Sequence, residues 1–586
     1  MAIQLSPGVN VSEVDLTTVV PSVSSTTGAF AGDFVWGPAN IRKNIDSETT
    51  LNSVFGAPTN TTYPSYFTAA SFLAYANDLR VVRAVNSGTH NAAANPFASP
   101  IQIANEGVYE TTYFHVDNAN SFGSFVARYA GALGNSIQVD VFDSSDASLF
   151  STGYVTVGSI SHKWSSLVNG VPGTSDYVVR AGGSADEFHI VVTDALGLFT
   201  GIKGSVLEVF PYVSKASDAV DGNNQTIYWK NVIASQSKYI YAMDAVDYVN
   251  TNSTWGGDST TSFARINLTQ TGNTAISLTN GTITSITDGD LETAYNLFSN
   301  KDEVDVSLVI TGNASVGVQQ YVIDNIVTGA GSAVGRSGDA LAFISPPYSA
   351  VVNQTGNEVT NIQTWLTSLS RSSSYAVADT GWKYMYDKYN NVYRYVPLNG
   401  DIAGLCAYTD SVRDPWYSPA GFNRGAVKNA VKLAWNPSQS QRDILYPLGI
   451  NPVVSFPGNG TILYGDKTLQ SKPSAFDRIN VRRLFMVLEK SIAKAAKFSL
   501  FEFNDDFTRA QFVALVAPFL RDVQGRRGIY DFRVVCDTTN NTAQVIDNNQ
   551  FIGDIYIKPA RSINFIKLNF IAVGTGVQFT EVAGAI

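Results

Sequence analysis

The fold class is decided by two short apolar stretches, Asp305-Val-Ser-Leu-Val-Ile310 and Asp339-Ala-Leu-Ala-Phe-Ile344. Continuous apolar runs of this length are typical of strands that are buried on both faces. Residues Val318–Val327 and Asn361–Ser370 carry apolar side chains at helical spacing, and Ser374–Ala378 is a third apolar run. This alternation of strand, helix, strand, helix and strand predicts a parallel sheet with helices on its faces.

A second unit of the same kind lies near the start of the chain. Gly28-Ala-Phe-Ala-Gly-Asp-Phe-Val-Trp-Gly-Pro38 predicts a buried strand that ends in a turn, and Pro64–Asn77 predicts a helix. Leu79-Arg-Val-Val-Arg-Ala-Val85 predicts the next strand. We therefore expect an α/β layer to begin here.

The segment between these units differs in composition. Residues 88–100 are rich in Gly, Ala, Asn and Pro, which indicates a domain boundary, and Thr251–Asp290 has the polar composition of loops. Short strands separated by turns indicate a β-dominated inserted domain. The strands expected there are Tyr109–Val116, Phe122–Tyr129, Ser136–Phe142, Asp176–Arg180 and Phe188–Asp194.

The last third of the chain predicts two helices followed by strands. Val481–Lys497 is amphipathic, and a second helix is expected after Asn504-Asp-Asp506, whose acidic groups suit a helix N-terminus. Gly525 is the expected C-cap of that helix. The strands expected after it are Tyr530–Cys536, Phe551–Ile557 and Ile563–Ala572.

Each end of the chain has the pattern of a single strand on a tether. A linker rich in Val, Ser and Thr follows the first strand, and a Gly574-Thr-Gly576 hinge precedes the last one. A lone half-apolar strand cannot satisfy its own backbone, so it must join either its own domain's sheet edge or a neighbour's sheet. The apolar positions are Ile3, Leu5, Val9 and Val11 in the first strand and Val577 and Phe579 in the last.

Composition excludes several classes of protein. The chain has 586 residues, of which 44% are hydrophobic, enough for several domains with cores. Only 15% are charged, which suits packing against copies of itself and equally suits a neutral polar surface. Cys406 and Cys536 are the only cysteines, so we expect no disulfide framework and folding in a reducing cytoplasm. We expect no signal peptide and no membrane span, and the net charge of -10 disfavours a nucleic-acid binder.

No motif for catalysis, a cofactor or a metal is found, and we predict none of these sites. The glycine-rich run Gly329–Gly335 follows a predicted helix, which is the wrong context for a dinucleotide loop. Asp410 and Asp414 near Arg413 fit paired catalytic carboxylates, although a structural ion pair in a turn is the simpler interpretation. The four histidines lack metal-ligand spacing: His90, His115, His162 and His189.

One segment of the chain is basic. Residues 472–527 hold 11 basic and 6 acidic residues, a net charge of +5 in a chain whose net charge is -10. The basic residues of the helix expected at 481–497 lie off its apolar stripe, which predicts either a solvated face or a surface for an acidic partner. They are Arg482, Arg483, Lys490, Lys494 and Lys497.

The order and spacing of many short motifs closely resemble those of the contractile tail sheath proteins of long-tailed bacteriophages. The similarity runs nearly end to end and is patchy between residues 96 and 340. The motifs are Ser6-Pro-Gly-Val9, Gly28 to Pro38, Phe55-Gly56, Phe72-Leu-Ala-Tyr75, Leu79-Arg-Val-Val-Arg83, Arg128 to Asn135, Val396-Pro-Leu-Asn-Gly400, Ala403-Gly404, Pro419-Ala-Gly421, Asn423-Arg-Gly425, Gly449-Ile-Asn-Pro452, Asn480-Val-Arg-Arg483, Ile555-Tyr-Ile-Lys-Pro559 and Ile563-Asn-Phe-Ile566.

The resemblance implies a mixed α/β and α+β, multidomain fold whose core domain is discontinuous. The implied parts are an N-terminal arm at 1–20 donated to a neighbour, core segments at 21–95 and 341–573, an outward-protruding β-rich insertion at 96–340, and a C-terminal arm at 574–586. The second core segment is the part implied to lie near the tube. The arms are implied to be extended strands that join a neighbouring subunit.

The resemblance also implies a function and partners. Subunits polymerise as stacked hexameric rings around an inner tail tube and contract to drive it through the host envelope during genome ejection. The implied partners are the tube, baseplate and tail terminator proteins, without direct nucleic-acid contact or membrane insertion. The implied location is the virion tail, after assembly in the host cytoplasm.

The basic residues at 481–497 are accordingly predicted to meet the inner tube. No cofactor is needed, because the drive is the free-energy difference between two packings of one sequence. Two alternative functions remain open. One is a virion-associated hydrolase that uses Asp410 and Asp414, and the other is a surface-layer lattice protein, which requires an export signal.

Overall fold

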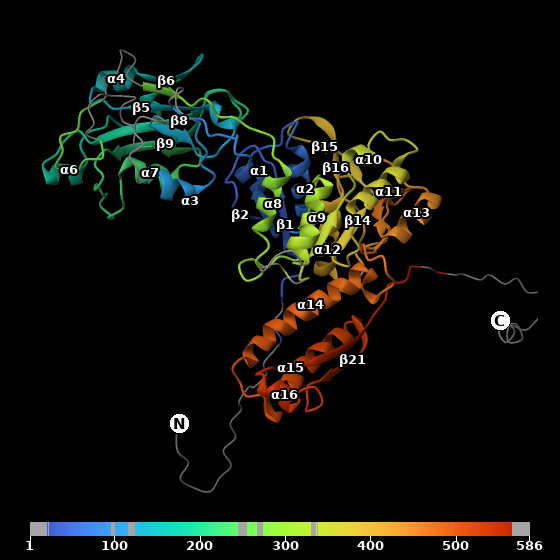
Figure 1. The fold of residues 1–586 in the computed structure, drawn as a ribbon. Helices are drawn as coiled ribbons and strands as arrows, with labels where there is room; N and C mark the ends of the chain where they lie inside the picture. The colour runs from blue at the N-terminus through green and yellow to red at the C-terminus, as the bar shows by residue number, and fades with distance from the viewer. Residues whose placement is uncertain are drawn as a thin grey trace, which may run out of the picture.

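The computed structural model of the chain describes residues 23–94, 100–114, 124–243, 255–265, 274–329 and 338–564, together with Val20, Arg336 and Ile566. Figure 1 shows a core around a central sheet, a β-rich unit at the upper left, and a C-terminal unit below the core. Several predicted positions lie outside the described residues: Ile3, Leu5, Val9, Val11, His115, Val577 and Phe579, and most of the run Gly329–Gly335.

The core is built on a seven-stranded sheet in the order β18-β14-β13-β12-β1-β3-β2. Neighbouring strands are parallel, as predicted, except that β2 is antiparallel to β3. Distant parts of the chain meet at β1, where Phe30 lies opposite both Val81 and Ile310. The strands are β1 Gly28–Gly32, β2 Arg42–Ile45, β3 Leu79–Arg83, β12 Leu308–Ile310, β13 Leu341–Ile344, β14 Ala376–Asp379 and β18 Ile450–Asn451.

Helices cover both faces of this sheet, because successive strand side chains point to opposite sides. Ala29 and Ala342 belong to one buried apolar cluster, and Phe30 and Phe343 belong to the other. The first cluster includes α8 Asp288–Asn296, α9 Val316–Tyr321, the π-helical turn Val322–Val327, α10 Tyr348–Val351, α11 Glu358–Leu369 and α13 Gln439–Leu445, and the second includes α1 Glu48–Phe55, α2 Tyr63–Leu73 and α12 Asn399–Val412.

Two glycines of α12 let it lie against α2. A Cβ atom at Gly400 would lie 2.4 Å from the Thr68 carbonyl oxygen, and one at Gly404 would lie 2.5 Å from the Tyr75 ring. A side chain at either position would therefore collide with Thr68 or Tyr75, whereas glycine has no Cβ atom and fits. The pairing of these helices therefore depends on glycine at both positions.

Two small antiparallel sheets complete the core. They are β15 Trp382–Asp387 with β16 Val392–Pro397 and β17 Lys432–Leu433, and β19 Val453–Phe456 with β20 Gly460–Leu463.

The β-rich unit is antiparallel throughout its described sheets. Its largest sheet has the order β11-β5-β8-β9, and two smaller sheets pair β4 with β10 and β6 with β7. Its elements are α3 Glu106–Tyr109, β4 Phe125–Ala127, β5 Ile137–Phe142, α4 Ala147–Thr152, β6 Tyr154–Val157, β7 Ile160–Lys163, α5 Trp164–Leu167, α6 Asp176–Ala181, β8 Glu187–Asp194, β9 Ser205–Ser214, α7 Trp229–Gln236, β10 Ile240–Ala242 and β11 Thr274–Ser277.

Two strands predicted in this unit are helices. Asp176–Arg180 lies in α6, because the Ser175 side chain accepts a hydrogen bond from the Val178 amide and Gly182 ends the helix in the left-handed conformation. Tyr109 is the last residue of α3, whose N-terminus is capped by the Asn105 side chain. The helix continues directly into the π-helical turn Glu110–Phe114. In such short segments the capping residues outweigh the strand-forming residue types.

The insertion ends earlier than the predicted residue 340. Both α8 and β12 belong to the core, and β12 is a central strand of its sheet. The predicted boundary came from the family resemblance, which is patchy between residues 96 and 340 and does not reveal that β12 pairs with β1.

The β-rich unit is attached to the core through Arg83 and Trp36. Arg83 is buried at the end of β3 and donates hydrogen bonds to the carbonyl oxygens of Phe34, Gly37 and Ala130, the last of which belongs to the β-rich unit. The Trp36 ring makes edge contacts with Tyr129 and Phe199 of the same unit, at centroid distances of 5.2 and 5.0 Å.

A protonated carboxyl group is enclosed at the carboxyl ends of the core strands. Asp379 ends β14, is 1% exposed, and accepts hydrogen bonds from the Ser345 hydroxyl at 2.6 Å and the Gly381 amide at 2.7 Å. Burial raises the pKa of Asp379 to about 8, although these bonds oppose the shift. The nearby Asp401 carboxylate is paired with Lys383 at 2.8 Å.

We expect this proton to make the stability of the fold depend on pH. The folded state retains a proton that the unfolded chain, with an Asp pKa of about 3.9, releases above that pH. The free energy of unfolding should therefore fall as pH rises from 5 toward 8, by up to ~1.4 kcal/mol per pH unit from this group. Urea unfolding of Asp379→Asn should show a flatter dependence. The exposed control Asp531→Asn should keep the original slope, and an unchanged slope in Asp379→Asn would contradict the assignment.

Candidate assembly site

The C-terminal unit consists of two long helices, a short helix and a two-stranded sheet (Figure 1). The Asp505 carboxylate begins the second helix by accepting a hydrogen bond from the Thr508 amide at 2.8 Å. Gly525, the predicted C-cap, is the last residue of that helix. The elements are α14 Ile479–Ala496, α15 Asp506–Gly525, β21 Ile529–Val535, α16 Ala543–Asp547 and β22 Asp554–Pro559.

Both predicted helices and the first two predicted strands are confirmed here. Of the third expected strand, Ile563–Ala572, the described residues Ile563, Asn564 and Ile566 are not in a strand, and the others lie outside the described residues.

One apolar cluster joins the helices to the sheet, and its helix side is more deeply buried than its sheet side. Buried side chains of α14 and α15 meet in this cluster, among them Leu488 and Val516. The inward side chains of the sheet remain only half-buried: Phe532, Val534, Ile555 and Ile557. These side chains stay half-buried because the sheet is narrow. Two strands spaced ~4.8 Å apart span less width than two helices of ~10 Å diameter each.

Both outer edges of this sheet are left unpaired by the described strands. Among the described strands, β21 and β22 pair only with each other. A two-stranded sheet is marginally stable alone, and an unpaired edge is a template for a further strand. This unit therefore has room for one added strand on each side.

The structure corrects the prediction that Arg482 and Arg483 lie on an exposed face. Arg482 is 6% exposed, donates to the Tyr375 and Ser374 hydroxyls at 3.0 and 2.8 Å, and stacks on the Phe476 ring. Arg483 is 2% exposed and forms a two-point ion pair with Asp410 at 2.7 and 2.6 Å. Both arginines lie between α14 and the core, so neither is available to a partner.

The three lysines predicted alongside them are divided. Lys490 pairs with Asp305 at 2.8 Å and donates to the Ser307 hydroxyl, so its charge is also engaged within the chain. Lys494 and Lys497 are exposed near the end of α14. Only these two remain candidates for an external partner.

An exposed apolar surface beside these lysines was missed by the sequence analysis. Five large side chains in the connection between α14 and α15 and at the start of α15 are 61–105% exposed. The sequence does carry a signal for this surface, because aromatic and polar residues alternate after Lys497. The connection between the two helices is too short to bury these aromatic side chains. The residues are Phe498, Leu500, Phe501, Phe503 and Phe507.

The chain enters the core beside Arg483. The Ser25 hydroxyl donates to the Asp410 carboxylate at 2.6 Å, and Arg483 donates to the Ser25 carbonyl oxygen at 3.2 Å. The Thr27 carbonyl oxygen accepts hydrogen bonds from the Ser307 and Leu308 amides at the start of β12. We call residues Ser24–Thr27 the N-terminal root.

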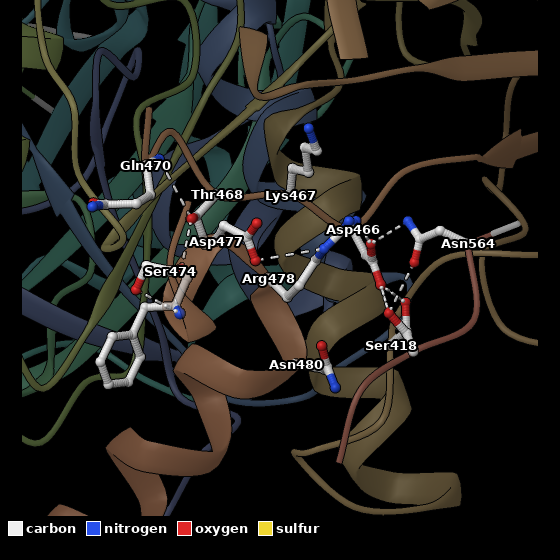
Figure 2. A network of polar contacts seen from close by, with 12 residues as sticks. Ser418, Asp466, Lys467, Thr468, Gln470, Ser474, Asp477, Arg478, Asn480 and Asn564 are labelled. Carbon is white, nitrogen blue, oxygen red and sulfur yellow. Dashed lines mark hydrogen bonds and ion pairs between the residues drawn. The ribbon is translucent and has the colours of Figure 1, made fainter. Parts of the chain in front are cut away.

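The chain leaves the C-terminal unit beside Arg478. Figure 2 shows Asp466 at the centre of a polar network that includes Ser418, Arg478 and Asn564. The Ser562 hydroxyl donates to Asp466 at 2.7 Å, Asn564 at 3.3 Å, and Arg478 at 3.0 Å. Although burial opposes ionisation, the Ser562 hydrogen bond and the Arg478 charge hold the pKa of Asp466 below its ordinary value. We call residues Ala560–Asn564 the C-terminal root.

The candidate catalytic carboxylates do not form a catalytic pair. Asp410 is bound to Arg483, and Asp414 is bound to Arg526. Burial raises the pKa of Asp414, while Arg526 opposes that shift. His162 and His189 each contact a backbone carbonyl oxygen, of Gly204 and Gly170, and His90 contacts the Thr282 hydroxyl.

Two further kinds of site are absent from the described parts of the chain. No group of three or more His, Cys, Asp or Glu side chains there is arranged to hold a metal ion. No helix there combines the length and the apolar character that a membrane crossing requires.

Sequence comparison finds similar proteins along nearly the whole chain. A family model described as the phage tail sheath protein central domain matches residues 326–469, and one described as the phage tail sheath C-terminal domain matches residues 471–572. The tail sheath protein of Vibrio phage KVP40 is 33% identical, with 99% of this chain and 100% of the relative covered. The tail sheath protein of Enterobacteria phage T4 is 35% identical, with 99% of each covered.

Solved structures agree at the level of the fold. The sheath tail protein from Listeria innocua superposes with a TM-score of 0.51 at 10% identity, over 92% of this chain and 96% of that one. A sheath tail protein from Desulfitobacterium hafniense gives a TM-score of 0.50, over 91% and 94%.

The burial of Arg483 predicts how charge reversal affects folding. Arg483→Glu places a second carboxylate beside Asp410 inside the chain, so we expect a loss of ~3–5 kcal/mol of unfolding free energy. Lys494→Glu and Lys497→Glu change exposed residues and should each stay within ~0.5 kcal/mol of the parent. Urea unfolding followed by circular dichroism measures both effects. Equal losses in all three variants would show that Arg483 is not an interior residue.

Proposed function

This chain belongs to the phage tail sheath protein family, and from that premise we propose that it builds a contractile sheath by lending its terminal strands to its neighbours. It is a structural subunit rather than an enzyme. The observation that carries the proposal is the narrow β21–β22 sheet, whose inward side chains stay half-buried against α14 and α15.

Two strands from other subunits complete this sheet. Four strands at ~4.8 Å spacing match the width of two packed helices. The donors are the arm at residues 1–20 of one neighbour and the arm at 574–586 of another, since both have the alternating pattern of a half-buried strand. Each donated strand adds several backbone hydrogen bonds, worth ~1 kcal/mol each in net terms.

Strand exchange suits a sheath that changes shape. Surface contacts between subunits break and re-form as the subunits rotate past one another, while the strand pairing persists and the linkers take up the displacement. The drive is the difference in free energy between two packings of the same subunits, so no nucleotide is required. We propose stacked hexameric rings around the inner tail tube, contracting to push the tube through the host envelope during genome ejection.

The partners follow from this arrangement. Besides its own copies, the subunit contacts the inner tube, the baseplate at one end of the sheath and the tail terminator at the other. Lys494 and Lys497, with the exposed apolar residues after them, form the surface we assign to the tube. The sheath belongs to the virion tail and assembles in the host cytoplasm.

The alternative functions receive less support. A hydrolase needs two available carboxylates, and Asp410 and Asp414 are each bound to an arginine. A surface-layer lattice is distinguished by the shape of the polymer, which would be a flat sheet rather than a tube.

Deletion of residues 1–16 tests strand lending. We expect a folded monomer that does not polymerise, because the sheet of the next subunit lacks its added strand. Electron microscopy and sedimentation measure assembly, and circular dichroism measures folding. As a matched control, Gln4→Ser with Asn10→Ser changes only polar positions of the arm and should polymerise normally. Tubes formed by the deletion variant would overturn strand lending.

Charge reversal at the end of α14 tests the tube contact. The double variant Lys494→Glu, Lys497→Glu should self-assemble but bind preformed inner tubes at least tenfold more weakly, because only the tube surface is altered. Co-sedimentation with purified tubes measures binding. A charge reversal elsewhere, Lys388→Glu, is the control, since Lys388 lies on the core and is 57% exposed. Unchanged tube binding by the double variant would refute the contact.

A further inference from the structure

We propose that the start of α14 anchors both arms, through two arginine–carboxylate clamps whose arginines are five residues apart. The clamps are Arg483 with Asp410 at the N-terminal root and Arg478 with Asp466 at the C-terminal root. This inference rests on the proposed strand lending for its purpose, although the clamps themselves are contacts within one chain.

The N-terminal clamp joins three segments at one carboxylate. Asp410, near the end of α12, binds both Nη atoms of Arg483 and the Ser25 hydroxyl. Arg483 also donates to the carbonyl oxygens of Ser25 and Cys406. The root is thus held through both its side chain and its backbone, in a site where Asp410 and Arg483 side chains are 5% and 3% exposed.

The C-terminal clamp repeats this arrangement with other residues (Figure 2). Asp466 follows β20 of the core, is 5% exposed at its side chain, and accepts hydrogen bonds from Arg478, Ser562 and Asn564. The Tyr446 hydroxyl joins the network, accepting from Arg478 at 2.7 Å and from Asn564 at 2.6 Å. This root is therefore tied to the core as well as to α14.

Polar contacts are what hold the C-terminal root. Ile563 and Ile566 are 81% and 78% exposed, so apolar burial contributes little there. A pocket of about 370 Å³ opens beside the root, lined by Asp477 and Arg478 together with residues 561–564 of the root. Without the Asp466 network, this stretch of chain has room to move away from α14.

The two clamps give the subunit one mechanical joint. Tension along either arm reaches α14 between Arg478 and Arg483 and passes directly into the core through Asp466 or Asp410. The β21–β22 sheet, which receives strands from other subunits, is bypassed. Separating either ion pair leaves a charge in a largely buried site, which makes each root resist displacement.

Hydrogen exchange of the full-length monomer tests the clamps apart from polymerisation. The Ser307 and Leu308 amides bond to Thr27 and report on the N-terminal root, whereas the Ala560 amide bonds to Gly528 and reports on the C-terminal root. We expect Asp410→Asn to speed exchange at least tenfold at Ser307 and Leu308 only, and Asp466→Asn to do so at Ala560 only. Asp531→Asn, which removes an exposed ion pair with Lys558, should change neither.

Milder variants keep the test decisive if an Asn variant fails to fold. Ser25→Ala and Ser562→Ala each remove only the hydroxyl bond of one root and should give the same local pattern at a smaller, threefold level. Uniform acceleration at both roots, or none at either, would overturn the clamp proposal. Strand lending is judged separately by polymerisation of the 1–16 deletion, so the two proposals fail independently.

The mechanical claim needs a second measurement. Pulling the full-length monomer by its two ends loads both roots in series. We expect the force of the first rupture to fall by at least a third in Asp410→Asn and in Asp466→Asn, and to stay unchanged in Asp531→Asn. An unchanged rupture force in both clamp variants would show that the roots do not carry the load.

Discussion

The central position of β1 in the core sheet is the constraint on which the rest of the structure depends. β1 is held between β3, which follows closely in the chain, and β12, which comes after the whole insertion. The core can therefore close only when distant parts of the chain have met. The residues before β1 also contact the start of β12 and the end of α12. The first turns of α14 pack beside the same end of α12. This placement brings the N-terminal root to α14, and the same helix contacts the C-terminal root through Asn480.

Buried guanidinium groups serve as joints throughout the molecule. Arg83 connects the β-rich unit to the core, and Arg483 connects α14, α12 and the N-terminal root. Arg336 binds carbonyl oxygens of Phe298, Val304 and Val306 and pairs with Asp339. The planar fork of arginine can reach several acceptors at once. Only 15% of the residues are charged, and these arginines place their charges in the interior of the fold instead of on its surface.

The helix α14 shows where inference from a single sequence fails. Its apolar stripe was identified correctly, with Leu484, Leu488 and Ile492 in the cluster shared with α15. The positions off that stripe were expected to form either a solvated face or a surface for an acidic partner, although Ile479 and Met486 pack against the core on another side. Because α14 packs against the core on one side and against α15 on another, it buries more than one face. Arginine can occupy a buried face where hydrogen-bond acceptors lie within reach of its guanidinium group. Arg482 and Arg483 were misassigned for that reason.

The sequence by itself determined the parallel core, the β-rich insertion, the two C-terminal helices and the two strands after them, because apolar periodicity and turn residues act over short distances. It also carried the family resemblance, which depends on the order of motifs along the chain. Only the tertiary structure decided that β12 pairs with β1, which basic residues are buried, and that both roots meet α14. Those features depend on pairings between residues far apart in the chain, and local patterns hold no information about which distant acceptor a side chain will meet.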